Sequence, residues 1–349
     1  MKRMKKFVTL LLSAAMTLAM SACGTDTSAG TPAAAPTETS APAPSSTENT
    51  GTSDKVYTVG IVQLVQHVAL DASAKGFQDE LVAQLGADAV KFDLQNASGD
   101  SATCSSIVSS FVTEKADLIL AIATPALQAA ANGTATIPVL GTAITEYGTA
   151  LSIDNFTGTV GTNVSGTSDL APLDQQAAMF DELVPNAKTI GIIYCSAEAN
   201  SKYQAEVVKE ALEKTGKTVN VYTFTDSNDV QAVTSSAVSE CDALYIPTDN
   251  TCASNTGLID PVASQAGVPI ICGEEGIMAG CGIATLSIDY YELGKTTGAM
   301  AAKILKGEAN VSEMPIEYYQ NPVKKYDEAR CAALNITVPS DYQAAPRAE

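Results

Sequence analysis

Polar residues that could bind a ligand directly follow a predicted apolar strand. Thr124 and Pro125 come after the apolar run at residues 116–123. This order is typical of a helix N-cap followed by proline at the first helical position. The free N–H groups of Ala126 and Leu127 would then face the edge of the sheet, where they could bind an anionic group together with the Thr124 hydroxyl. Helix capping without a ligand is the alternative.

The chain contains a single histidine, His67. It lies in a loop between the apolar run at residues 57–64 and a helical pattern that includes Leu70. A lone histidine is usually structural, but its place in this loop makes ligand contact or stacking on a ring a real alternative. The sequence holds no G-x-S-x-G signature, so a catalytic triad has no support. His67 and Leu70 are therefore candidates for ligand contact.

Further candidates follow later strands of the same pattern. Thr145 and Tyr147 come after the run at residues 138–143, and Tyr147 could stack on an aromatic ligand or be an exposed loop residue. Asn200 precedes a Ser-x-x-Gln sequence that fits a capping box, so capping alone explains it nearly as well as ligand contact does.

Carboxylates follow two strands of the second half of the chain. Asp249 and Asn250 follow one predicted strand, and Glu274 and Glu275 follow the next. Two adjacent carboxylates could suggest glycosidase chemistry. Neighbouring side chains in an extended loop diverge, however, so contact of one of them, with Glu275 as the candidate, to a ligand ammonium or a backbone N–H is the preferred interpretation.

Composition and motifs disfavour several other classes of site. No C-x-x-C or C-x-x-H pair occurs, which argues against a zinc site. Gly294-Lys295-Thr296 resembles the end of a P-loop, but Asp289 occupies the position of the required first glycine. The net charge of −19 would repel nucleic acid and anionic lipid. We therefore expect no cofactor, no metal, no nucleic-acid partner and no enzymatic activity.

The elements that must position these residues alternate between strand-like and helix-like patterns. The expected strands lie at residues 57–64, 89–94, 116–123, 138–143 and 159–164, and then at residues 189–195, 218–224, 242–247, 269–273 and 282–288. A helix at residues 291–305 follows the last of them. Alternation of this kind predicts parallel sheets with helices on both faces.

The two series of strands resemble each other. In each, an Asp, an apolar strand, a terminal Thr and a later strand that starts with Pro recur in order, at residues 115–139 and 240–270. We therefore predict an α/β protein with two similar Rossmann-like lobes joined by a multi-strand hinge. The first lobe would comprise residues 55–165 and about 290–320, and the second residues 166–289 and about 321–340.

The N-terminus carries a targeting signal. A basic start is followed by a short apolar run, and residues 1–22 end in Met-Ser-Ala before Cys23. This resembles the processing site of bacterial lipoproteins, in which the cysteine is lipidated, although Met20 replaces the usual leucine. Plain secretion with cleavage after Ala22 is the alternative. Residues 23–54 are a Thr-, Ser-, Pro- and Ala-rich linker, which we expect to be disordered.

Seven cysteines remain after Cys23. An odd number leaves at least one unpaired within the chain. Several lie in or beside apolar strands, where a free thiol packs as a small hydrophobic group. Free thiols are preferred over a disulfide such as Cys272–Cys281.

Six segments together resemble a known family. They are residues 60–71 (GIVQLVQHVALD), 120–126 (LAIATPA), 164–169 (VSGTSD), 197–201 (AEANS), 245–251 (YIPTDNT) and 288–294 (IDYYELG). They are similar to the substrate-binding lipoproteins of ABC importers with the type I periplasmic-binding-protein fold, in the branch that includes tryptophan and tyrosine binders. The resemblance extends over residues 57–339.

The resemblance implies a two-lobed clamp that closes on a small ligand, and its branch implies that this ligand is an aromatic amino acid. In amino-acid binders of this fold a carboxylate near Ser168-Asp169 pairs with the ligand ammonium, which makes Asp169 the candidate. The ligand carboxylate would meet Thr124 and the adjoining amides, and the ring would lie near His67 and Leu70. Relatives commonly have Asp-Pro where this chain has Glu146-Tyr147.

The implied partners are the permease and ATPase subunits of an ABC importer. The protein would be a monomer, anchored to the outer face of the cell membrane through lipidated Cys23. A sugar- or nucleoside-binding protein of the same fold is one alternative, although the absence of tryptophan argues mildly against stacked sugar rings. A surface sensor or adhesin without a transport role is the other.

Overall fold

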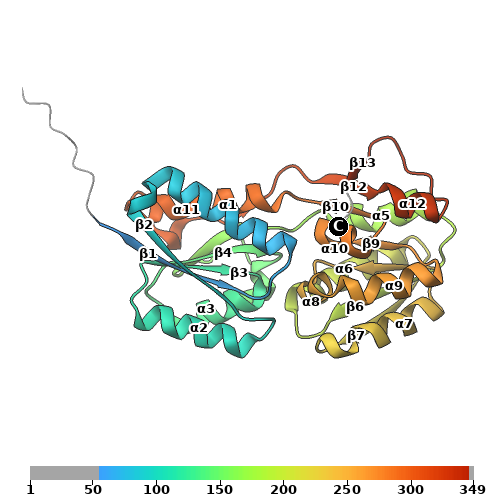
Figure 1. Cartoon of the computed structure of the whole chain (residues 1–349), viewed down its shortest axis with the longest axis horizontal. Coiled ribbons are helices and arrows are strands. Elements are labelled where there is room, and N and C mark those ends of the chain that lie inside the picture. The colour runs from blue at the N-terminus through green and yellow to red at the C-terminus, as the bar shows by residue number, and fades with distance from the viewer. Residues whose placement is uncertain (1–54, 346–349) are drawn as a thin grey trace, which may run out of the picture. The chain divides into compact units, whose positions relative to one another are not determined.

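The computed structural model describes residues 55–345, which form an α/β protein with two separate sheets (Figure 1). The predicted signal segment at residues 1–22 and the linker at residues 23–54, which includes Cys23, lie outside the described residues. Within residues 55–345 no helix has the length and apolar character needed to cross a membrane. The predicted fold class, two α/β lobes with mainly parallel sheets, is confirmed.

The first lobe is built on a six-stranded parallel sheet. Its order is β11 (Glu317–Tyr318), β5 (Val164–Ser168), β4 (Val139–Ile144), β3 (Leu118–Ile122), β1 (Tyr57–Gln63) and β2 (Val90–Asn96). The helices of this lobe are α1 (Val68–Leu85), α2 (Ser101–Thr113), α3 (Thr124–Gly133), α4 (Tyr147–Leu151) and α11 (Tyr290–Leu305). Helices α1 and α11 pack together on one face of the sheet, and α2 and α3 cover the other (Figure 1).

The second lobe contains a seven-stranded sheet. Its order is β13 (Gln343–Ala345), β12 (Val323–Asp327), β10 (Ala284–Ser287), β9 (Ile270–Cys272), β8 (Ala243–Ile246), β6 (Thr189–Cys195) and β7 (Thr218–Phe224). Strand β12 runs antiparallel to β10, and the other pairs are parallel. The helices are α5 (Leu173–Leu183), α6 (Ala199–Lys214), α7 (Val230–Glu240), α8 (Asn250–Ser254), α9 (Thr256–Ala266), α10 (Glu275–Cys281) and α12 (Glu328–Ala333).

The central strands are apolar because both of their faces are covered. All five residues of β3, Leu-Ile-Leu-Ala-Ile, are buried, as expected for a strand between two layers of helices. The edge strand β2 instead mixes apolar and polar residues, and only its first residue is buried. The central strands place their carboxyl ends along one edge of each sheet, where the following loops carry the candidate residues.

The chain crosses between the lobes three times. It leaves the first sheet after β5, returns after β10 to form α11, and leaves again after β11 to form β12 and β13. Because three segments of the chain connect the lobes, the lobes can move by a hinge motion but cannot rotate freely. The predicted multi-strand hinge is therefore present.

One strand lies elsewhere than the sequence predicts. The apolar character of residues 159–164 predicted a strand there, but β5 is Val164–Ser168, with the sequence Val-Ser-Gly-Thr-Ser. Its polar side chains are buried because they find partners: Ser165 Oγ donates to Met314 O at 3.0 Å, and Thr167 Oγ1 lies 2.8 Å from Thr297 Oγ1. A polar strand with internal partners gives no apolar signal in the sequence.

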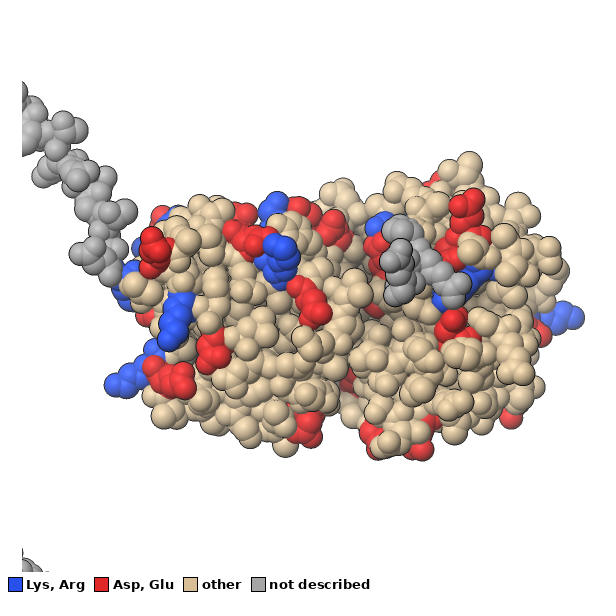
Figure 2. Space-filling view, viewed as in Figure 1, with Lys and Arg blue, Asp and Glu red and all other residues tan. Residues whose placement is uncertain are grey.

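All seven cysteines of the described residues are free and buried: Cys104, Cys195, Cys241, Cys252, Cys272, Cys281 and Cys331. This agrees with the preference for free thiols over a Cys272–Cys281 disulfide. The chain has a net charge of −19, and in the view of Figure 2 Asp and Glu side chains lie on the surface of both lobes.

Candidate functional site

The two lobes contact each other through polar side chains at the carboxyl edges of their sheets. His67, directly before α1, places its Nε2 3.2 Å from Asn250 Oδ1 in the second lobe. Gln204 of α6 donates from Nε2 to Thr145 Oγ1 in the first lobe, at 3.5 Å. These contacts define a closed arrangement of the lobes around the predicted site.

The β8–α8 corner of the second lobe concentrates two buried carboxylates. Asp249 accepts hydrogen bonds from the N–H groups of Cys195 (2.8 Å) and Cys252 (2.7 Å). Glu198 accepts from the N–H and side-chain amide of Asn250, and from the N–H and hydroxyl of Thr251, at 2.6–3.0 Å. Burial, followed by the charge of Asp249, raises the pKa of Glu198 to about 7. The first turn of α8 is therefore saturated with acceptors.

A third buried carboxylate belongs to the crossover after β5. Asp169 Oδ2 accepts a hydrogen bond from the Tyr290 hydroxyl at 2.9 Å. Burial raises the pKa of Asp169 to about 6, against the opposing effect of that hydrogen bond. Glu274 lies close enough for the charge of Asp169 to contribute to its raised pKa of about 7, whose main cause is burial. Glu274 itself caps α10 through the N–H groups of Gly276 and Ile277.

Asn200 lies between these two regions. Its Nδ2 donates to Thr248 O at 2.8 Å, which fixes the orientation of its amide. The sequence suggested Asn200 as the cap of the following helix, but the N-cap of α6 is Glu198 and Asn200 is the second helical residue. Gln204, one turn later, accepts from Thr248 N and donates to Asn200 O.

The β3–α3 corner of the first lobe has the opposite character. Thr124 is the first residue of α3 and Pro125 the second, so the N-cap is Ala123 rather than Thr124. Ala123 contributes no side-chain capping bond and has φ 80° and ψ 156°, a region that is essentially restricted to glycine. Thr124 and Ala126 are buried at this corner. A strained alanine at an uncapped helix start leaves backbone N–H groups available for a ligand.

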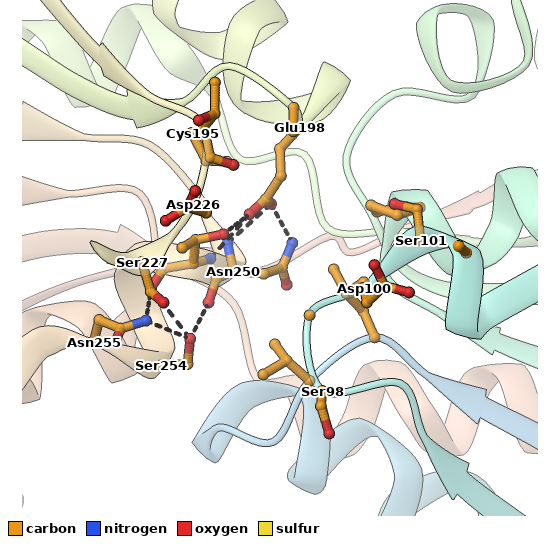
Figure 3. Close-up of a pocket in the computed structure, with 18 residues that line it drawn as sticks. Ser98, Asp100, Ser101, Cys195, Glu198, Asp226, Ser227, Asn250, Ser254 and Asn255 are labelled. Carbon is orange, nitrogen blue, oxygen red and sulfur yellow. Dashed lines mark hydrogen bonds between the residues drawn. The ribbon is translucent and has the colours of Figure 1, made fainter. Parts of the chain in front are cut away.

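A cavity of about 470 Å³ opens between the lobes beside the β8–α8 corner (Figure 3). Ser98, Asp100 and Ser101 of the first lobe face Glu198 and the α8 region across it. Of the residues predicted from the sequence, only Pro125 and Asn250 line this cavity. The others lie deeper between the lobes or within one lobe.

Several predicted residues have structural roles. Leu70 packs in the core of the first lobe and is 2% exposed, and Tyr147 is 1% exposed. The Tyr147 hydroxyl donates to Gly141 O and Thr167 O, so this residue is neither an exposed loop tyrosine nor an open stacking platform. Ser168 Oγ donates to Thr145 O. Glu275 pairs with Lys325.

Three residues at the site were not identified from the sequence: Glu198, Gln204 and Tyr290. Glu198 is the N-cap of helix α6 and Gln204 belongs to that helix, where the pattern indicated only capping. Tyr290 starts α11 directly after its N-cap Asp289. A polar residue at the first turn of a helix that follows a predicted strand is the only available signal, and it does not distinguish capping from ligand contact.

Three buried acceptor atoms between the lobes have no hydrogen-bond partner among the described residues: Asp169 Oδ1, Asn200 Oδ1 and His67 Nδ1. Two further buried atoms without a partner, Ser73 Oγ and Thr285 Oγ1, are hydroxyls within α1 and β10. Buried polar atoms are almost always paired, because an unpaired one costs about 1–3 kcal/mol. The site can therefore accept hydrogen bonds from a ligand that brings several donors.

The described residues contain no group of three or more His, Cys, Asp or Glu side chains placed to hold a metal ion. The chemistry available at the site is hydrogen bonding and charge pairing, with buried carboxylates in the second lobe and at the crossover after β5, and an open helix start in the first lobe.

Comparison with known proteins places the chain in a family. Residues 58–343 match the family described as ABC transporter substrate binding protein. A tyrosine-binding protein of Clostridioides difficile strain R20291 is 38% identical over 304 residues, which cover 83% of this chain and 87% of that protein.

Two solved structures extend this comparison. A Streptococcus pneumoniae ABC domain in complex with L-tryptophan has 33% identity and a TM-score of 0.78, over 82% of this chain and 97% of that one. A substrate-binding protein with adhesive properties from Clostridium difficile, in its ligand-free open form, has 38% identity and a TM-score of 0.64, over 84% and 100%. The fold is that of type I periplasmic binding proteins.

The chain crosses between its two lobes three times and places polar side chains at the facing edges of the two sheets. This architecture agrees with the family match over residues 58–343. The chain belongs to the family of ABC transporter substrate-binding proteins.

Proposed function

We propose that this protein captures an aromatic amino acid outside the cytoplasm by closure of its two lobes and delivers it to the permease of an ABC importer. The observation that carries the proposal is the set of three open acceptors between the lobes, one of which belongs to a carboxylate. A ligand ammonium is the group that supplies several N–H donors and a compensating positive charge.

Asp169 is the proposed partner of the ammonium. It is 4% exposed, and only one of its two oxygens is paired within the protein. A carboxylate left half-paired in a buried site favours a cation, because an ammonium offsets the cost of burying the charge. Asn200 Oδ1 is a second acceptor for the same group.

The ligand carboxylate is proposed to lie at the start of α3. Thr124 and Ala126 are buried there, and Ala123 provides no capping side chain. Backbone N–H groups at a helix start are a common site for a carboxylate. The ammonium would thus lie between Asp169, directly after β5 of the first lobe, and Asn200 of α6 in the second lobe, so that binding favours the closed state.

The comparisons support the aromatic ligand and the closed state. One relative is a tyrosine-binding protein and another structure contains L-tryptophan. This chain superposes better on the tryptophan complex than on the ligand-free open structure, although its identity to the latter is higher. The arrangement described here is therefore closer to a ligand-bound form.

The remaining parts of the proposal concern partners and place. The protein acts as a monomeric, non-enzymatic subunit alongside a permease and an ATPase. Lipidation at Cys23 would anchor it to the outer face of the membrane through the linker at residues 23–54, and both lie outside the described residues.

Two other functions are distinguished by experiment. A surface adhesin is suggested by the relative with adhesive properties. A sugar or nucleoside ligand would use the same fold with other contacts. Thermal unfolding of the purified protein should be measured with all common amino acids, nucleosides and sugars, since a ligand at 100 times its Kd adds about 2.7 kcal/mol.

The first variant to test is Asp169→Asn. It leaves a buried ammonium without a charged partner, so affinity for the aromatic amino acid should fall by about 3–5 kcal/mol, or more than a hundredfold. The matched control is Asp174→Asn, on the exposed start of α5, which should bind normally. Stabilisation by sugars or nucleosides alone would exclude the amino-acid ligand, and stabilisation by none of the compounds would favour the adhesin.

A further inference from the structure

The orientation of one amide is fixed by its charged neighbour. Asn250 Nδ2 lies 2.6 Å from Glu198 Oε2, and its backbone N–H lies 3.0 Å from the same oxygen. Above its pKa of about 7, Glu198 is ionised, and a flipped amide would then set the Asn250 oxygen against a carboxylate oxygen with no proton between them. Asn250 Oδ1 must therefore face His67, 3.2 Å from its Nε2.

This amide in turn determines where the proton of His67 lies. Because Asn250 Oδ1 only accepts, His67 Nε2 must be the donor. Burial lowers the pKa of His67, against the opposing effect of the Asn250 hydrogen bond, and keeps the ring neutral at pH 7. In this tautomer Nδ1 carries a lone pair. That atom is buried without a partner and makes no capping bond to α1.

The three open acceptors are not equivalent. Asp169 and Asn200 carry the two that suit an ammonium, as proposed above. His67 follows β1, whereas Asp169 follows β5, and the sheet order β5-β4-β3-β1 separates these strands by three spacings, about 14 Å. An ammonium bound at Asp169 therefore does not reach His67, and a carboxylate carries no donor, so His67 Nδ1 is left to a donor on the ligand side chain.

We infer that His67 is a specificity-determining residue whose Nδ1 accepts a hydrogen bond from a donor on the ligand ring. This inference rests on the proposed function. The phenol O–H of tyrosine or the indole N–H of tryptophan supplies such a donor. Phenylalanine leaves Nδ1 buried and unpaired. Glu198 acts as a positioning residue, because it holds the Asn250 amide that selects the tautomer.

Calorimetric titration with tyrosine, tryptophan and phenylalanine tests the selection. The wild-type protein should bind at least one of the two ring donors about tenfold or more tightly than phenylalanine, the usual effect of one unpaired buried acceptor. His67→Leu should bring that ratio close to one, because it weakens the donor-bearing ligand more than phenylalanine. Gln66→Leu, at the exposed neighbouring position, should keep the wild-type ratio.

The single histidine permits a direct second measurement that needs no variant. In untagged protein labelled with ¹⁵N-histidine, the NMR spectrum reports one imidazole. The protonated nitrogen should be Nε2, and the Nδ1 resonance should shift on addition of the donor-bearing amino acid but not of phenylalanine. Glu198→Gln, which can offer an N–H in place of the carboxylate oxygen, should mix the two tautomers.

Two results would overturn the inference. One is equal affinity for all three amino acids with an unchanged Nδ1 resonance, which would leave the proposed function intact. The other is a free protein in which Nδ1 carries the proton. Absence of binding to every aromatic amino acid would instead reject the proposed function, and the inference with it.

Discussion

The β3–α3 corner of the first lobe and the β8–α8 corner of the second have the same sequence pattern and opposite electrostatics. Each is an apolar strand followed by a threonine and a helix. Helix α3 begins at a strained alanine without a side-chain cap. Helix α8 begins at Asp249 and is further capped by Glu198, so its first N–H groups are occupied.

This difference shows how a pair of similar lobes can bind a ligand with two unlike ends. The first-lobe corner offers unoccupied donors, the crossover after β5 offers the half-paired carboxylate of Asp169, and the second lobe offers the open acceptor of Asn200. The ammonium of a zwitterion contacts Asp169 and Asn200 together only when the lobes are closed. An anion alone would engage the first lobe only and would not favour closure.

Of the changes that test this difference between the corners, removal of the Glu198 side chain that caps α8 should have the largest effect on stability. Glu198→Ala leaves the buried N–H groups of Asn250 and Thr251 without their acceptor. We expect the free energy of unfolding to fall by about 2–4 kcal/mol, measured by chemical denaturation at pH 7. Glu206→Ala, on the exposed face of α6, should change it by less than about 0.5 kcal/mol. Equal effects of the two variants would contradict the role of Glu198.

Raising the pH should act on the same charges with a smaller effect. The folded-state pKa values of Asp169 (about 6), Glu198 (about 7) and Glu274 (about 7) exceed their ordinary values of 3.8, 4.5 and 4.5. Between about pH 4 and 7 the folded chain therefore binds more protons than the unfolded chain, and the free energy of unfolding falls as the pH rises.

The ligand-free protein should accordingly be more stable at pH 5 than at pH 8, and the lowered pKa of His67 offsets part of this difference below about pH 6.5. Chemical denaturation at both pH values measures this difference. Glu274→Gln should reduce it, because one of the carboxyl groups that titrate in the window is removed. Higher stability at pH 8 than at pH 5 would show that the folded state does not suppress ionisation of these groups.

A variant that removes the backbone strain at Ala123 should have the smallest effect on stability. Ala123→Gly removes the strain of φ 80° and ψ 156°, at the cost of a more flexible unfolded chain. We expect a net stabilisation of about 1 kcal/mol, detected as a higher Tm. Ala126→Gly, a few residues into α3, should instead destabilise by about 1 kcal/mol. A loss of stability in both variants would mean that Ala123 is not strained.

Much of the fold was predictable because its signal is local. Strands β6 and β7 were predicted with the bounds that the structure has, since Thr189–Cys195 and Thr218–Phe224 are continuous β-rich runs. Strand β5 was misplaced, because Val-Ser-Gly-Thr-Ser carries no apolar signal and its side chains find partners as distant as Met314 and Thr297.

The candidate site was predictable only in outline. Sequence order places Thr124, Asp169, Asn200 and Asn250 after strands that end at the sheet edges, and the structure brings them to the region between the lobes. The same rule selected Tyr147 and Leu70, which pack inside the first lobe. Position after a strand does not reveal whether a side chain turns towards the cleft or towards the core.

The sequence by itself determined the two-lobed α/β architecture, the family and the strand ends that carry polar residues, because periodicity and short motifs are properties of neighbouring residues. Only the tertiary structure decided which polar atoms lack partners. His67, Asn250 and Glu198 come from segments up to 183 residues apart. Their tautomer, amide orientation and protonation follow from contacts made only after the lobes have folded and closed.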